Sequence, residues 1–176
     1  METTDILLIA VIAMVPAILV ILVVRMIIKK FFEREYSEKV KEIKDLARER
    51  IQPLRLQAYE RFLLYLERIN PNNSIINLYK PGMSARLLQS SLIDKIRSEF
   101  DHNMAQQLYI SDSSWESIRN AREETLKIIN MAAKNCGPDA TGIDLSNKIY
   151  EIISQLKEIP TDTAAKTLKK EARRLF

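Results

Sequence analysis

Few residues in this 176-residue chain have the chemistry of a catalytic or metal-binding site. The one histidine, His102, follows Asp101, but adjacent residues on a helix point in different directions, and no third partner for acid–base catalysis is evident. The one cysteine, Cys136, excludes an internal disulfide and a cysteine-based zinc site. The three glycines are too scattered for a phosphate-binding loop. The sequence therefore predicts no catalytic residue, no cofactor and no metal site, and we do not expect an enzyme.

An uncharged stretch near the N-terminus is the most specific feature of the sequence. Residues 6–24 are 19 residues without Asp, Glu, Lys or Arg, and a helix of that length extends over roughly 28 Å, close to the hydrocarbon thickness of a bilayer. A signal peptide would have a basic start and a shorter apolar core, whereas acidic residues precede this stretch. We therefore predict a transmembrane helix over residues 6–28, after a short extracytoplasmic N-terminus of residues 1–5.

Basic residues on one side of this stretch predict its orientation. Arg25, Lys29, Lys30 and Arg34 follow it, and only acidic residues precede it. Because positively charged flanks stay in the cytoplasm, the remaining chain is expected there, with these four residues close to the lipid headgroups.

Residues 29–52 are rich in Glu, Lys and Arg and are expected to continue the membrane helix as a charged stalk. Tyr36, Val40, Ile43 and Ala47 follow steps of four, three and four residues, which place them on one helical face. The next heptad position is Arg50, so the repeat is short for a coiled coil. This stripe is expected either to pack on the protein's own domain or to form the seam of a parallel dimer.

Residues 53–176 have the spacing of helices and no sustained alternation of the kind that strands show. Residues 54–69 are apolar over most of the helix circumference, which predicts a central helix. Trp115 is interpreted as a core anchor in preference to a contact for a partner. The sequence thus predicts an all-α protein, with an N-terminal transmembrane helix, a stalk and a cytoplasmic helical bundle of residues 53–176.

Capping residues predict where the helices of this bundle begin and end. Ser84 is the expected N-cap of one helix, and Ser113 has the capping-box spacing to a glutamate at the start of another. Gly137 is expected to end that helix in a left-handed conformation. Either Thr141 or Asp144 is expected to open the helix that follows.

The C-terminal segment is the one place where a binding role competes with a structural one. Small and apolar residues share one face of the expected helix, and five basic residues surround it: Lys166, Lys169, Lys170, Arg173 and Arg174. Such a helix fits an anionic lipid surface or a protein partner. It also fits a closing helix of the bundle with an ordinary charged surface. Nucleic-acid binding is less favoured, since no aromatic residues alternate with the basic ones.

Three stretches together resemble a known family: residues 53–71, the segment from Leu88 to Asn103, and the helix that contains Trp115. The chain is similar to uncharacterised single-pass membrane proteins from Bacteroidota bacteria. The resemblance implies a bacterial inner membrane and no particular activity, and it assigns no functional residue.

These observations favour a non-enzymatic, membrane-anchored interaction or scaffold protein, an accessory component of an inner-membrane assembly. Its partner would be another protein or a second copy of the chain, and no small-molecule substrate is evident. The alternative is peripheral contact with anionic lipid or nucleic acid through the basic C-terminal helix.

Overall fold

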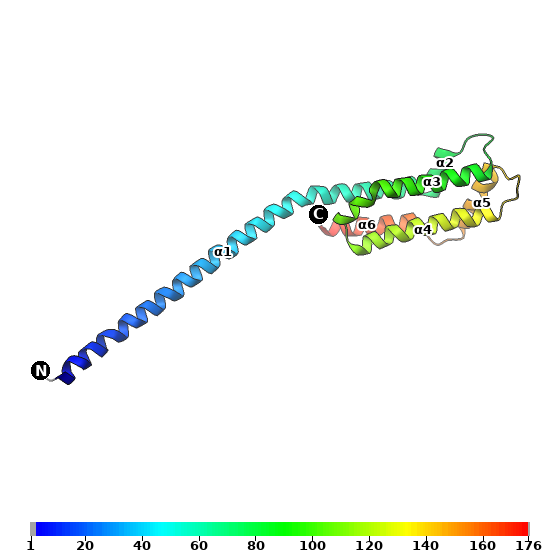
Figure 1. The fold of residues 1–176 in the computed structure, drawn as a ribbon. Helices are drawn as coiled ribbons and strands as arrows, with labels where there is room; N and C mark the ends of the chain where they lie inside the picture. The colour runs from blue at the N-terminus through cyan, green and yellow to red at the C-terminus, as the bar shows by residue number, and fades with distance from the viewer. Residues whose placement is uncertain (1–2, 176) are drawn as a thin grey trace. The chain divides into compact units, whose positions relative to one another are not determined.

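The structure, a computed structural model, describes the backbone of residues 3–175 and the side chains of residues 12, 14, 16 and 18–175. Its helices, in chain order, are α1 (Thr3–Ile69), α2 (Pro71–Leu78), α3 (Ala85–Asn103), the 3-10 helix η1 (Met104–Tyr109), α4 (Asp112–Lys134), α5 (Gly142–Ser154) and α6 (Pro160–Leu175) (Figure 1). Across residues 3–175 there is no strand, only an isolated bridge between Ser84 and Thr141. The all-α prediction is confirmed.

The chain divides into two compact units, residues 1–51 and residues 52–176. The first unit is the N-terminal part of α1, and the second begins within the same helix. Pro53 lies beside the division and has no N–H to donate to the carbonyl of Glu49. The sequence left open whether the helix breaks at Pro53, and α1 continues through it to Ile69.

The first unit exposes most of the apolar side chains that the structure describes in it. The aliphatic side chains and the methionine between Ile18 and Ile28 are 45–61% exposed. Within the part of the chain that the structure describes, no helix combines the length and the apolar character needed to cross a membrane. The predicted transmembrane helix, residues 6–28, includes residues 6–11, 13, 15 and 17, whose side chains lie outside the described ones.

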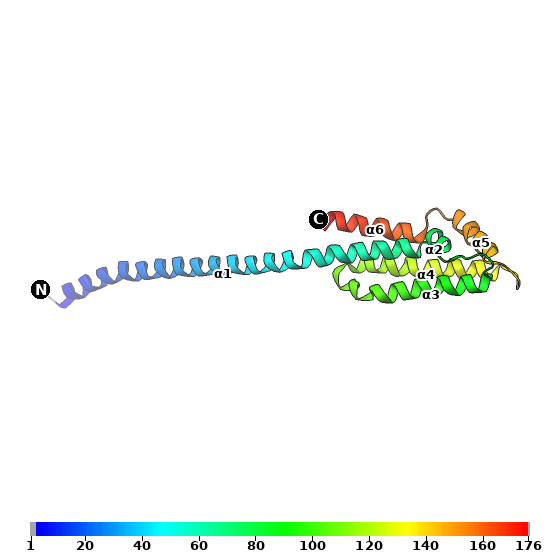
Figure 2. The ribbon, with the colours of Figure 1, turned by 90° about the horizontal axis from the view of Figure 1, so that it is seen from above.

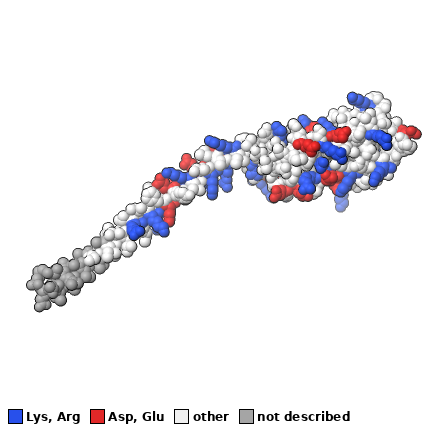
Figure 3. Space-filling view, in the orientation of Figure 1, with Lys and Arg blue, Asp and Glu red and all other residues white. Residues whose placement is uncertain are grey.

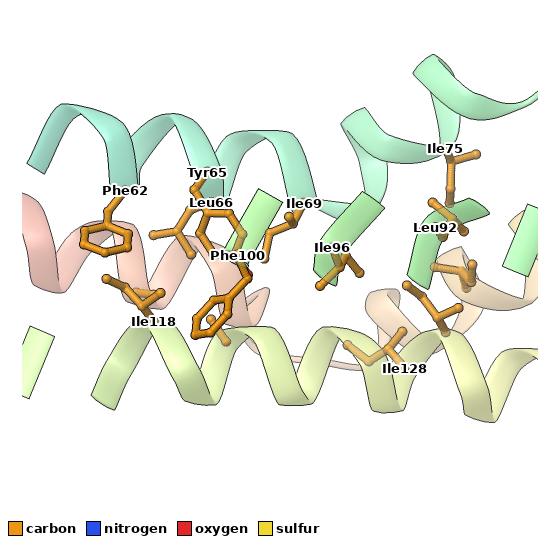
Figure 4. Packing of buried hydrophobic residues seen from close by; sticks show 14 of the residues in the cluster. Phe62, Tyr65, Leu66, Ile69, Ile75, Leu92, Ile96, Phe100, Ile118 and Ile128 are labelled. Carbon is orange, nitrogen blue, oxygen red and sulfur yellow. The ribbon is translucent and has the colours of Figure 1, made fainter. Parts of the chain in front are cut away.

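The second unit has one apolar core. Figures 1 and 2 show α3, α4 and α6 alongside the last part of α1, with α2 and α5 where α4 finishes. From Ala58 to Ile69, α1 buries a full face in this core, as predicted for a central helix, whereas Leu54 and Leu56 remain 43% and 44% exposed. The largest fully buried side chains come from α1, α3, α4 and α5, and many are drawn in Figure 4: Tyr59, Phe62, Tyr65, Leu66, Ile69, Leu88, Leu92, Ile96, Ile118, Ile129, Leu145 and Ile149.

The predicted helix ends are partly confirmed. The Ser84 hydroxyl accepts from the Leu87 amide and caps α3. Thr141 and Asp144, the two residues considered for the start of α5, form one capping box. Thr141 is the N-cap, and the Asp144 carboxylate accepts from the Thr141 amide at 2.8 Å. The left-handed conformation expected at Gly137 was wrong, since Gly82 is the one residue with positive φ in the described chain. α4 ends instead at Lys134.

The predicted N-cap of α4 was also wrong. Ser111, not Ser113, caps this helix, and its hydroxyl accepts from the amide of Ser114 at 3.1 Å. Both serines have the right chemistry, but a contact with a distant glutamate on α6 positions Ser111. A capping motif in sequence cannot register such a contact.

This cap assignment predicts unequal effects of two similar substitutions. Ser111→Ala is expected to lower the free energy of unfolding by about 1–2 kcal/mol, because it removes the N-cap. Ser113→Ala is the matched control, and we expect a change within about 0.5 kcal/mol, as for an exposed surface residue. Urea unfolding followed by the fluorescence of the single tryptophan, Trp115, compares them. Equal losses would contradict the assignment.

Candidate interaction surfaces

Glu171 holds the C-terminal helix α6 onto two other elements of the second unit. Its Oε1 accepts from the Tyr59 hydroxyl of α1 at 2.5 Å and from the Ser111 amide at 3.1 Å. Its Oε2 accepts from the Ser111 hydroxyl at 2.6 Å and from the Ser114 hydroxyl. We call Glu171, Tyr59, Ser111 and Ser114 the Glu171 cluster. A carboxylate at the N-terminus of α4 is also favoured by the helix dipole.

The electrostatics of the Glu171 cluster follow from burial and from these donors. Burial alone raises the pKa of Glu171, but the hydrogen bonds from Ser111, Ser114 and Tyr59 outweigh it, so that this pKa lies below its ordinary value. Burial and the adjacent Glu171 carboxylate raise the pKa of Tyr59 to about 12. The ionised carboxylate and the neutral phenol are therefore the paired states at neutral pH.

The role of Glu171 was not predicted from the sequence, in which it is the one acidic residue among the five basic residues from Lys166 to Arg174. The available signal was its position three residues after Leu168, next to the apolar face of the expected helix. The donors, however, come from residues 57 to 112 positions away in sequence, so no local pattern identifies them.

The apolar face of α6 is part of the core, so α6 is the closing helix of the bundle. Leu168 and Ala164 are fully buried against the other helices of the second unit. Of its five basic residues, all exposed, Lys166 pairs with Glu158. No ion pair within the described residues involves the other four: Lys169, Lys170, Arg173 and Arg174. These four side chains form the basic face of α6. This face can contact another molecule while the apolar face of α6 stays packed in the core.

Trp115 is a core anchor, as interpreted from the sequence. Its ring stacks on Phe100 with centroids 5.3 Å apart, and it lies 5.8 Å from the ring of Phe62. The Arg122 guanidinium lies 4.4 Å from the centre of the Phe100 ring, a cation–π contact. Trp115 and Arg122 are seven residues apart on α4 and therefore lie on the same side of that helix, where both contact the Phe100 ring.

The residues with catalytic potential are not brought together. His102 is exposed at the end of α3, and no hydrogen bond or ion pair of its side chain is found in the described region. The Cys136 thiol is half-buried and donates to the carbonyl of Ala132, with a sulfur–oxygen distance of 3.3 Å. Residues 12, 14, 16 and 18–175 contain no group of His, Cys, Asp and Glu side chains arranged to hold a metal ion.

Among the hollows on the second unit, besides one of about 410 Å³ formed by the loop after α4 and the start of α5, two lie between helices. One of about 510 Å³ lies between the start of α3 and the end of α4, and Arg86 is the charged residue in its lining. The other, of about 270 Å³, lies where α1 meets α2 and is lined in part by Leu64 and Ile76. These two side chains are 55% and 73% exposed. The second hollow therefore combines an open position with exposed apolar atoms, as protein contact sites do.

Charged side chains of both signs are intermingled on the face of the second unit that Figure 3 shows. Most of the ion pairs among the described residues of the second unit join neighbours on one helix, such as Lys127 with Glu124 at 2.6 Å. Arg68 of α1 instead reaches Glu99 of α3 at 3.0 Å. This face carries no continuous basic groove of the kind that nucleic acids require.

In the first unit, the predicted stripe of the stalk is open. Tyr36 and Ile43 are 73% and 66% exposed, Ala47 is exposed, and Val40 is partly covered. The flanking basic residues, predicted to face lipid headgroups, are exposed as well: Arg25, Lys29, Lys30 and Arg34. Lys29 and Arg34 make i,i+4 ion pairs with Glu33 and Glu38, at 3.9 and 3.2 Å.

Comparison with known proteins gives a family and no activity. A model described as a family of unknown function (DUF7935) matches residues 5–175, nearly the full chain. No curated protein and no solved structure matches the chain.

Proposed function

Because the chain belongs to this family of unknown function, its role has to be inferred from its own residues, and we propose that it is a membrane-anchored helical interaction protein. In this proposal residues 6–28 cross a bacterial inner membrane, and residues 1–5 lie outside. The second unit projects on the cytoplasmic side and contacts another protein of the membrane. No catalytic step is assigned to it.

The observation that carries the proposal is the uncharged apolar run at the start of α1. Residues 6–24 include no charged side chain in the sequence, and the backbone of residues 3–28 is helical. The described apolar side chains from Ile18 to Ile28 are exposed, which is costly in water at about 25 cal/mol per Å² of apolar surface. Lipid tails would cover that surface at no such cost.

The second unit supports the interaction part of the proposal. Its core is complete within the unit, so the exposed apolar side chains Leu64 and Ile76 are not needed for folding. An anchored protein meets a membrane-bound partner at a raised effective concentration, so that a small contact area suffices.

Two measurements test the anchor. The protein is expected in the membrane fraction after carbonate washing, and to be released by mild detergent. In intact cells, an impermeant maleimide should label a cysteine placed at Thr3 but not Cys136, and both once the membrane is opened. Recovery in the soluble fraction, or labelling of Cys136 in intact cells, would refute the anchor or its orientation.

The interaction is tested by purifying tagged full-length protein from its native membrane and identifying what remains bound. A stoichiometric membrane protein would make the chain an accessory subunit of that protein's assembly. A monomer with nothing bound would argue against the interaction function.

The basic face of α6 supports a second function, contact with an anionic surface. Its four basic side chains face solvent and have no ion pair among the described residues, while Leu168 holds the helix in the core. Contact would therefore be electrostatic, without insertion of the helix. Binding to anionic vesicles that weakens with salt, and is lost on neutralising Lys169, Lys170, Arg173 and Arg174, would favour this function over the first.

A further inference from the structure

The apolar repeat in the first unit is longer than the four residues of the predicted stripe. Phe32 lies four residues before Tyr36, and Ile51 lies four residues after Ala47. The successive steps are therefore four, four, three, four and four residues. Steps of four, four and three residues repeat every eleven positions. We therefore call these six residues the eleven-residue stripe: Phe32, Tyr36, Val40, Ile43, Ala47 and Ile51.

An eleven-residue repeat differs physically from a heptad. It places three apolar residues in three helical turns, or 3.67 residues per turn, so the stripe stays on one face of a nearly straight helix. The heptad interpretation placed Arg50 at the next position and ended the seam there. The eleven-residue interpretation places Ile51 at that position, which extends the stripe over five turns.

The same steps continue along the sequence of α1 into its packed part. Leu54, Ala58, Phe62, Tyr65 and Ile69 follow at steps of three, four, four, three and four residues. The last four of these are at most 1% exposed in the core of the second unit. In this chain, the spacing therefore marks a face that packs against other helices.

In the eleven-residue stripe, by contrast, the large side chains are open. Phe32, Tyr36 and Ile43 are 63–73% exposed, and Ile51 is 46% exposed. In proteins, most of the stability of a helix comes from the packing of its apolar face against other elements. The stripe thus has the pattern of a packing face without its partner.

We propose that the eleven-residue stripe pairs with the same stripe of a second copy of this chain, in parallel and in register. The parallel arrangement rests on the proposed function, since copies anchored with one orientation in one membrane hold their stripes at one height.

Two features favour a second copy over a different helical partner. Helices that interlock over five turns need the same apolar repeat, and an ordinary heptad drifts about 20° per seven residues from a straight helix. An identical copy matches the repeat at every step. Residues 32–51 also contain six basic and six acidic residues, so that two copies bring no net charge together.

Disulfide cross-linking of the full-length protein tests the pairing. In a Cys136→Ser background, Ala47→Cys places a cysteine on the stripe, and Asp45→Cys places one on the opposite side of the helix. A disulfide needs Cα atoms roughly 4.4–6.8 Å apart, which in-register pairing gives at position 47 but not at 45. Under mild oxidation in native membranes, we expect Ala47→Cys to form at least tenfold more covalent dimer than Asp45→Cys.

A second pair of variants tests the stripe without a cysteine. Ile43→Lys is expected to convert the detergent-extracted dimer into monomer. Leu46→Lys changes an apolar side chain that is 50% exposed but lies outside the stripe, and it should leave the dimer intact. Trp115 fluorescence reports whether the second unit of each variant is folded.

The outcomes separate this inference from the proposed function. Equal cross-linking at positions 45 and 47, a product with the mass of a different partner, or a monomeric parent protein would overturn the pairing even if the protein is in the membrane. Recovery in the soluble fraction would overturn the anchor, while selective cross-linking at position 47 would still support pairing of the stripe.

Discussion

Phe62→Ala is expected to lower the free energy of unfolding of the second unit by about 3–5 kcal/mol, the range for removing a buried aromatic side chain. Phe62 is fully buried and lies 5.8 Å from Trp115, at the point where α1 meets α4. Its loss leaves a cavity between elements that are far apart in sequence, and the helices cannot close it without shifting Trp115.

Urea titration followed by Trp115 fluorescence measures this loss, because the chain has no other tryptophan and the midpoint reports the second unit alone. Leu64→Ala is the matched control on the same helix. Its side chain is more than half exposed, so we expect a change within about 0.5 kcal/mol. If both variants lose the same stability, the assignment of the buried face of α1 is wrong.

Glu171→Gln is expected to lower the free energy of unfolding by about 2 kcal/mol at neutral pH. The charge-assisted hydrogen bonds from Tyr59, Ser111 and Ser114 become weaker bonds to a neutral amide, and the amide N–H group faces donors in place of an acceptor. The folded pKa of Glu171 is below its unfolded value near 4.5. The ionised group therefore contributes stability above pH 4.5, and that contribution is lost as the pH falls through the folded pKa.

The difference between the parent protein and Glu171→Gln should thus shrink in acid, and a pH series of urea midpoints measures it. Lys170→Gln changes the neighbouring exposed residue and should leave the pH dependence of the parent unaltered. A constant difference from pH 7 to pH 3 would show that ionisation of Glu171 does not stabilise α6.

On the alkaline side, the raised pKa of Tyr59 predicts that the neutral phenol stabilises the fold up to pH 10 and that this contribution is lost towards pH 12.

Two kinds of contact hold α6 in place on the second unit. The core contact through Leu168 and the polar contact through Glu171 fix both sides of that helix. The basic face of α6 is consequently presented by a helix that is held on both sides, and rotation or release of that helix would break these contacts. Any lipid or protein that it contacts would meet a preformed surface.

The sequence by itself predicted the helices, because their signals are local. The spacing of Leu88, Leu92, Ile96 and Phe100 requires only the period of a helix, and all four are buried. Ser84 and Thr141 cap helices through side-chain contacts with residues three positions away. The absence of alternating residues excluded a sheet for the same local reason.

Only the tertiary structure decided which of several equivalent local choices is used. Ser111 and Ser113 are equally good caps in isolation, and the contact of Ser111 with Glu171, 60 residues away, distinguishes them. Gly137 can adopt a left-handed conformation, but α4 ends three residues before it at Lys134. The sequence of the C-terminal segment is compatible with a free amphipathic helix, but in the structure Leu168 is buried in the core. Periodicity determines which face of a helix is apolar, whereas the partner of that face depends on long-range packing that no local pattern contains.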